Sequence, residues 1–274
     1  IFVLFKLFKK YHIDTFQAIV INYLMATVVG FLSYESAVNF KNLSASNWFI
    51  GAVLLGILFI AIFNIMAITA QKNGISVASV ASKMSVIIPI VFGIYIYNES
   101  AGMIKIIGIV LALIAVYMAS VKVKQNIPIQ KSLFLPGILF LGSGIIETSL
   151  KYLETTYVEA DGIPIFSATI FASAGIVGLI IIAVKILKKE LQLDLKSIPA
   201  GLVLGFVNYC SIYFILKALQ YKDAESSTIF TVNNVSIVMM SALLGYFLFK
   251  EQLSLRNVFG IALAILSIIL IALA

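Results

Sequence analysis

The chain has 274 residues, of which 62% are hydrophobic and 11% are charged. Soluble domains contain roughly 45–50% apolar and about 25% charged residues, so this composition excludes a water-soluble fold and indicates that lipid is the solvent. The formal net charge is +7. The basic residues are spread over the ends of hydrophobic runs, where they orient a membrane protein, and we expect no nucleic-acid partner.

The hydrophobic runs are continuous and about twenty residues long, which is the length that a helix needs to cross a bilayer. Barrel strands would instead alternate apolar and polar residues. We interpret residues 1–9 as the tail of a first helix that begins before this sequence, so the fold class is an all-α membrane protein with ten transmembrane helices. In chain order, nine full helices are expected at residues 14–34, 47–71, 75–97, 101–121, 133–153, 164–187, 197–219, 225–248 and 255–274.

A polar connection at residues 122–132 divides these helices into five and five, which gives a first repeat at 1–121 and a second at 133–274. Five helices per copy is an odd number, so the second copy must be inverted in the membrane. Inverted repeats are common in transporters, whose substrate site lies near the midplane. At one offset of 152 residues, Gly93, Glu99, Gly108, Ile109, Leu111 and Ala112 match Gly245, Glu251, Gly260, Ile261, Leu263 and Ala264.

The charges of the connections predict an orientation. Alternating connections place 13 of the 19 basic residues on one side of the membrane. The positive-inside rule assigns that side to the cytoplasm and the C-terminus to the outside.

The matching turns resemble the two halves of the drug/metabolite transporter superfamily, in particular its EamA-like ten-helix members. In that pattern a helix contains a proline and ends at a glutamate, and a glycine follows nine positions later. Residues 67–120 fit it with Pro89, Glu99 and Gly108, whereas in residues 214–273 Val238, near the equivalent place, departs from the proline. The resemblance implies a transporter of metabolites, amino acids or drugs, and it implies that both termini lie in the cytoplasm.

Lys83 is the most informative single residue. It lies nine residues after Gly74, or about 14 Å along a helix, close to the middle of a hydrocarbon core about 30 Å thick. Charges at that depth usually face a cavity or a partner. Lys83 is therefore either a cationic anchor for a substrate carboxylate or phosphate, or one side of a structural ion pair. Asn233 and Asn234 occupy the corresponding region of the second half and could line the same cavity.

Glu147 and Lys151 lie four residues apart on one predicted helix, so they share a face. The expected depth of Glu147 is nearer one membrane surface than the centre. One interpretation is an ion pair at that interface, and the other is a carboxylate for proton coupling or gating, because a partly buried acid can titrate near neutral pH.

The repeated residues Glu99 and Glu251, with Gly108 and Gly260, have a structural interpretation. Each glutamate opens a helix, where a carboxylate meets the positive end of the helix dipole. Gly201 and Gly205 form a Gly-x-x-x-Gly pair, which predicts close helix packing.

Polar residues in mid-helix complete the candidate substrate site, which includes Asn64, Asn208 and Tyr209. The leading hypothesis is a secondary transporter, an exporter or exchanger of small metabolites, that works by alternating access around a central cavity. The alternatives are a membrane-embedded enzyme and a helical scaffold subunit. The lone His12 and Cys210 provide no catalytic or metal-binding cluster, so we expect no enzyme, no cofactor and no metal. The expected partners are a small-molecule substrate and the lipid bilayer of a bacterial inner membrane, for a monomer or homodimer.

Overall fold

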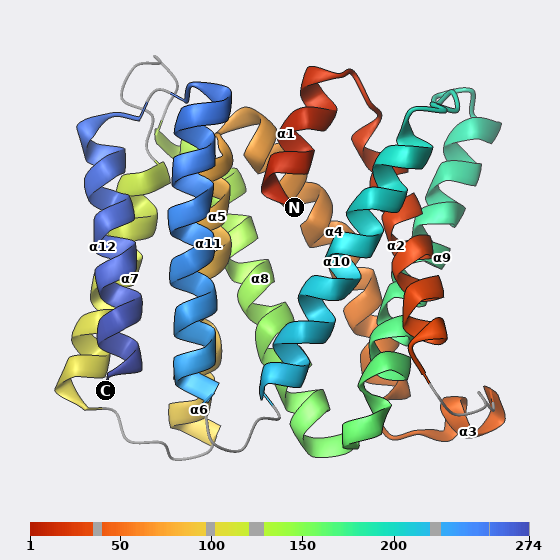
Figure 1. Ribbon diagram of the computed structural model, residues 1–274, viewed down its shortest axis with the longest axis horizontal. Helices are drawn as coiled ribbons and strands as arrows, with labels where there is room; N and C mark the ends of the chain where they lie inside the picture. Colours follow the sequence, from red (N-terminus) through yellow and green to blue (C-terminus); the bar gives the residue numbers. More distant parts are fainter. Residues whose placement is uncertain (35–39, 97–101, 121–128, 220–225, 252, 274) are drawn as a thin grey trace. The chain divides into compact units, whose positions relative to one another are not determined.

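The computed structural model describes residues 1–34, 40–96, 102–120, 129–219, 226–251 and 253–273, and every regular element in these residues is helical (Figure 1). Its contacts group the chain into two compact units. Unit 1 consists of Ile1, Leu7–Asn64 and Ser149–Tyr221. Unit 2 consists of Phe2–Lys6, Ile65–Thr148 and Lys222–Ala274. Each unit combines segments from both predicted repeats. The two divisions differ because the repeats are defined by sequence similarity and the units by which segments pack together.

Three helices contribute to both units. They are α1 (Phe2–Lys10), α4 (Phe49–Lys72) and α8 (Ile129–Tyr157). Unit 1 also contains α2 (Thr15–Leu32), α3 (Phe40–Ala45), the 3₁₀ turn η1 (Ala160–Gly162), α9 (Ile163–Leu187) and α10 (Ser197–Leu219). Unit 2 also contains α5 (Ile75–Met84), α6 (Ile87–Ile96), α7 (Met103–Ser120), α11 (Ser226–Phe249) and α12 (Leu255–Ala272).

In the described residues, six helical segments are long and apolar enough to cross a membrane, and α5 with the first part of α6 counts as one of them. They are Thr15–Leu32, Phe49–Lys72, Ile75–Phe92, Leu133–Tyr157, Ile163–Leu187 and Ser197–Ala218. Shorter apolar helices occupy Ile106–Ala115, Ser236–Phe249 and Leu255–Ile271. The expectation of an all-α membrane protein is therefore confirmed, whereas the count of ten spanning helices is not confirmed by the described residues.

In unit 1, α2 packs against both α9 and α10. The approach of α10 to α2 depends on glycine: a Cβ atom at Gly201 would lie 2.5 Å from Cβ of Ile21 and 2.7 Å from the carbonyl oxygen of Ala18. At Gly205 a Cβ atom would collide with the carbonyl oxygen of Asn22. The predicted close-packing role of this glycine pair is confirmed.

The ends of α2 and α10 are joined by polar contacts outside the spanning segments. The backbone N–H of Asp14 donates to the Asp194 carboxylate at 2.9 Å, and this bond holds the pKa of Asp194 below its ordinary value. Gln17 donates to the carbonyl of Gln192 at 2.8 Å and accepts from the N–H of Asp194 at 3.0 Å. Because Asp14 also caps α2 through Gln17, the loop before α10 is fixed to the first turn of α2.

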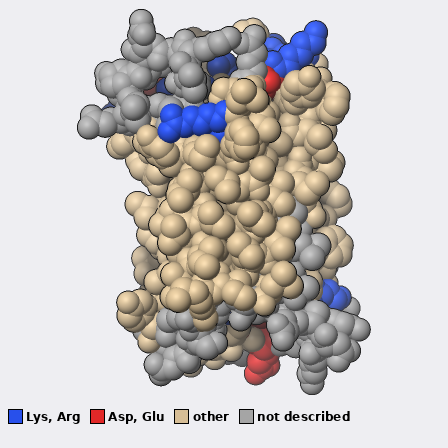
Figure 2. Space-filling view, turned by 90° about the vertical axis from the view of Figure 1, so that its left-hand side faces the viewer, with Lys and Arg blue, Asp and Glu red and all other residues tan. Residues whose placement is uncertain are grey.

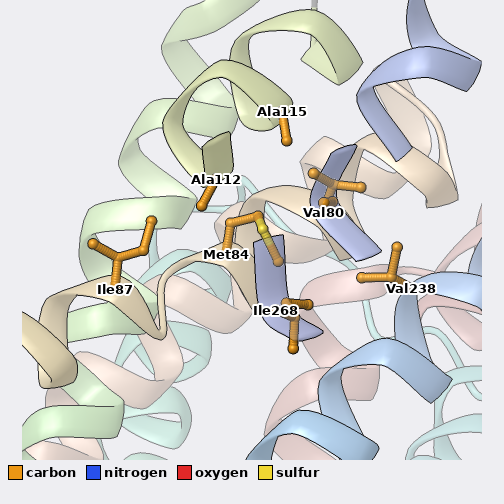
Figure 3. Packing of buried hydrophobic residues seen from close by; sticks show 8 residues of the cluster. Val80, Met84, Ile87, Ala112, Ala115, Val238 and Ile268 are labelled. Carbon is orange, nitrogen blue, oxygen red and sulfur yellow. The ribbon is translucent and has the colours of Figure 1, made fainter. Parts of the chain in front are cut away.

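In unit 2, a buried hydrophobic cluster joins α5, α6, α7, α11 and α12 (Figure 3). Its residues are Val80, Met84, Ile87, Ala112, Ala115, Val238, Ala264 and Ile268. At Gly108 a Cβ atom would lie 2.5 Å from the Ile271 side chain, and the Gly108 carbonyl accepts from the Ser267 hydroxyl at 2.7 Å. Gly108 therefore lets α12 lie directly against α7, while Gly260 is buried on α12.

The outer face of unit 2 is apolar. Met103, Ile106 and Val110 of α7 and Val258 and Phe259 of α12 are between 45% and 73% exposed. Figure 2 shows that the lysines, arginines and acidic residues drawn in colour on this face lie towards its two ends, with an uncharged band between them. An apolar band between charged ends is the surface that a bilayer requires.

We predict that Gly205→Ala destabilises the protein by about 1–3 kcal/mol, because a methyl group there meets rigid backbone and overpacking has that cost. Thermal unfolding of the detergent-purified variant would measure the loss. The matched control is Gly137→Ala in α8, where a Cβ atom meets nothing within 4 Å and alanine is the better helix former by about 1 kcal/mol. Equal melting temperatures for the two variants would contradict the packing assigned to Gly205.

Candidate functional site

A membrane-spanning helix is interrupted between α5 and α6, at Ser85 and Val86. The sequence predicted one continuous helix here, and Pro89 is the physical reason for the difference. Proline has no N–H, and its ring clashes with the carbonyl four residues earlier, which belongs to Ser85. That carbonyl instead accepts from the N–H of Ile88 at 2.9 Å, a tighter turn that ends α5 and starts α6.

The interruption leaves backbone groups that side chains then satisfy. The N–H of Val86 points to the carbonyl of Lys83, at 3.5 Å, so the carbonyl of Ser82 has lost its usual helical donor. The hydroxyl of Ser85 donates to this carbonyl. Ser85 is completely buried and Ser82 is 4% exposed. The Ser82 carbonyl, which has no access to water, therefore obtains its hydrogen bond from a neighbouring side chain, as backbone groups inside a membrane protein must.

An ion pair lies at this interruption. Nζ of Lys83 is 3.8 Å from Oε1 of Glu147 on α8, and Oγ of Ser85 lies 3.2 Å from Oε2 of Glu147, within hydrogen-bond distance. Lys83 is the ninth of the 18 residues in the candidate span Ile75–Phe92, and its depth in the bilayer stays a prediction. The two charged side chains are 19% and 24% exposed. Charges at mid-span cost about 2.5–3.5 kcal/mol each on insertion scales, and pairing offsets part of that cost.

The pairing of Glu147 differs from its sequence interpretation. Its ion pair in the described residues is with Lys83 instead of Lys151. The local i,i+4 rule was the only guide that the sequence offered, whereas a contact between distant segments decides the partner.

Small residues on α8 make this contact possible. A Cβ atom at Gly144 would collide with the side chain of Ile88 in α6, so α8 and α6 are in direct contact one turn before Glu147. In the same turn, the Ser143 hydroxyl lies 3.3 Å from the Ser82 hydroxyl. Sequence reasoning missed Ser143 and Gly144. Their signal was the run of small residues Gly142–Gly144 just before the acidic residue Glu147.

The other predicted substrate residues belong to both units. In unit 2, Asn234 is 2% exposed and accepts from the amide of Asn233 at 3.4 Å. In unit 1, the amide of Asn64 donates to the Ile60 carbonyl of its own helix at 2.7 Å. Asn208 donates to the Asn22 side chain at 3.1 Å. These bonds have the form of helix-packing contacts, and the substrate role of these residues remains a prediction.

Tyr209 and Lys151 also belong to unit 1. Tyr209 is 3% exposed, and its ring stacks on Tyr213 with 5.8 Å between centroids. Lys151 lies one turn after Glu147 on α8 and is partly buried. Among the described residues, no group of three histidine, cysteine, aspartate or glutamate side chains could hold a metal ion.

Glu251 has a structural role, but at a different helix from the one expected. Its Oε1 accepts from the N–H of Ile75 at 2.8 Å and from Nζ of Lys6 at 3.2 Å. The carboxylate therefore caps the N-terminus of α5, whereas α12 begins after its own capping residue, Ser254. Hydrogen atoms in place of side chains at Gly74 and Gly245 leave room for this carboxylate. Its repeat counterpart Glu99 lies outside the described residues.

The described residues thus define a multi-pass helical membrane protein with an ionisable pair at the middle of an interrupted span. A family profile described as the EamA-like transporter family matches residues 135–273, which is more than half of the chain. The chain therefore belongs to the EamA-like transporter family, as its sequence motifs indicated. An uncharacterized protein of Haemophilus influenzae is 28% identical over 277 residues, covering 97% of this chain and 91% of that protein.

We predict that Glu251→Ala lowers the free energy of unfolding by about 1–3 kcal/mol, because it removes a helix cap and leaves a partly buried lysine, Lys6, without its partner. Denaturant unfolding of the purified protein measures the change. Glu190→Ala is the control, since Glu190 is exposed in the connection after α9 and surface changes stay within about 0.5 kcal/mol. A stability equal to that of the control would show that the Glu251 cap is not a structural support.

Proposed function

We propose that this protein is a secondary transporter that exports or exchanges small organic solutes, among them metabolites such as amino acids, by alternating access around a central cavity. The observation that carries the proposal is the Lys83–Glu147 pair at an interrupted span. Interrupted helices in transporters free polar backbone to contact substrate, and ionisable residues at membrane depth mark substrate or ion pathways. Membership of the EamA-like transporter family supports the same conclusion.

We further propose that the fold is a pair of inverted five-helix repeats. Two observations support this. The helices α7 (Met103–Ser120) and α12 (Leu255–Ala272) begin and end 152 residues apart, at the offset that relates the sequence motifs. They also pack against each other in unit 2, as two copies related by a two-fold axis can. A bacterial inner membrane is the proposed location, since the Haemophilus influenzae relative is a bacterial protein.

Flux measurements test the proposal. Protein reconstituted into phospholipid vesicles should move at least one solute from a radiolabelled panel of amino acids, carboxylates, nucleosides and sugar phosphates. Lys83→Ala should reduce that flux by about tenfold or more, since loss of a charge-assisted contact is worth about 1.5–3 kcal/mol. The absence of flux for every solute with correctly folded protein would contradict the transporter function.

Two further variants separate transport from folding. Lys83→Ala leaves Glu147 buried without its counter-ion, which is destabilising, whereas Lys83→Met with Glu147→Gln removes both charges and should fold well. The double variant should remain inactive in flux while matching the wild type in gel filtration. Lys189→Ala, at an exposed lysine after α9, should keep wild-type flux. Normal flux by the double variant would show that substrate binds elsewhere.

A further inference from the structure

The Lys83 ammonium has hydrogen-bonding capacity that its contacts do not use. An ammonium carries three N–H donors, and within the described residues Lys83 has its ion pair with Glu147 and no hydrogen bond from Nζ. The 3.8 Å between Nζ and Oε1 exceeds the roughly 2.7–2.9 Å of a charge-assisted hydrogen bond. The side chain is 19% exposed. A ligand oxygen can therefore bind Lys83 more closely than Glu147 does.

Among the described residues, Lys83 is the cation that forms an ion pair with Glu147. Residues 75–96, which form α5, α6 and the turn between them, contain no other charged side chain. The helices packed against α5 carry Lys105 in the first turn of α7 and Arg256 in the first turn of α12, while α11 carries no charged side chain. On α8 itself, Lys151 and Glu154 follow one and two turns later.

The hydroxyl of Ser85 shows which protonation state of Glu147 its neighbours can satisfy. Ser85 has one hydroxyl proton but two acceptors within reach, the Ser82 carbonyl and Oε2 of Glu147. When Glu147 is ionised, the Ser85 hydroxyl can donate to only one of these acceptors, and the other has no hydrogen bond from Ser85. When Glu147 is protonated, its O–H donates to Oγ of Ser85, and the Ser85 hydroxyl donates to the Ser82 carbonyl. Both O–H groups then have an acceptor, and the Ser82 carbonyl has a donor.

We infer that the site binds one small organic monocarboxylate together with one proton. The ligand carboxylate pairs with Lys83 in place of Glu147, and Glu147 accepts a proton from water and hydrogen-bonds to Ser85. This inference rests on the proposed transport function and names its substrate class and coupling ion.

Charge balance supports this stoichiometry. The empty site holds Lys83⁺ and Glu147⁻, with a net charge of zero. The loaded site holds Lys83⁺, the ligand carboxylate and neutral Glu147, and its net charge is again zero. A ligand bound without the proton would leave one uncompensated negative charge at mid-span, which the low-dielectric surroundings disfavour. The ligand and the proton therefore bind as a unit.

Binding measurements on the purified protein test the inference without requiring flux. The probes are acetate, lactate, pyruvate and benzoate, each compared with sodium chloride at equal ionic strength, at pH 5.5, 6.5 and 7.5. At least one probe should bind, and above the pH at which Glu147 titrates its affinity should fall by up to about tenfold per pH unit, the limit for one linked proton. Calorimetry in buffers of different ionisation enthalpy should show uptake of one proton per carboxylate bound.

The variants separate the two parts of the site. Glu147→Gln mimics the protonated carboxyl, so it should bind the same probe with an affinity that is independent of pH and with no proton uptake. Lys83→Met with Glu147→Gln should lose binding while remaining folded. The inference is wrong if no probe binds the wild type, if binding is independent of pH, or if Glu147→Gln keeps the wild-type pH dependence.

These outcomes differ from failure of the transport function. Solute flux in vesicles combined with binding that does not depend on pH would preserve the proposed transporter and overturn the coupled proton. Proton-linked carboxylate binding without flux of the bound probe in vesicles would support the site and overturn its transport role.

Discussion

The arrangement of unit 2 depends on one constraint: lipid offers no hydrogen bonds, so each polar group at mid-span needs a partner within the protein. Pro89 interrupts the helix at Ser85, so backbone groups at this point need hydrogen-bond partners from outside the helical pattern. The hydroxyl of Ser85 then satisfies the freed carbonyl of Ser82 and also reaches Glu147. The same interruption gives Lys83 its place beside a turn that polar side chains surround. The helix interruption and the Lys83–Glu147 pair thus lie at one position, where the Ser85 hydroxyl is within hydrogen-bond distance of both the freed carbonyl and the Glu147 carboxylate.

Two carboxylates in unit 2 form ion pairs with lysines in different surroundings. Glu251 accepts from Lys6 and also from the backbone N–H of Ile75, so its charge is stabilised by the positive end of the α5 helix dipole. Glu147 is held by Lys83 at 3.8 Å and by a hydroxyl that has another acceptor. The first carboxylate accepts from a backbone N–H, while the second shares its hydroxyl donor with a backbone carbonyl, as the proposed binding of a ligand and a proton requires.

The sequence predicted the elements well and their partners poorly, for a physical reason. The bounds of α10 at 197–219 and the mid-span position of Lys83 follow from hydrophobic run length and helical rise, which are local properties. The partner of Glu147 and the helix that Glu251 caps depend on segments 64 and 176 residues away, and no local rule encodes them. Pro89 was visible as a motif residue, but its effect on the helix required the competing hydrogen bonds of Ser85 and Ile88.

The second half of the chain clarifies why one site of this kind arises. Residues 75–96 correspond at the offset of 152 to residues 227–248, which lie in the single uninterrupted helix α11. No proline occurs in α11, and valine stands at position 235, where the offset places the counterpart of Lys83. A continuous helix satisfies its own backbone, so α11 needs no serine at a turn, and its Val238 joins the hydrophobic cluster against α12 (Figure 3). The two segments that this offset relates therefore differ in structure: residues 75–96 hold one side of an ion pair at a helix interruption, and residues 227–248 lie in a continuous helix that contributes Val238 to the hydrophobic cluster.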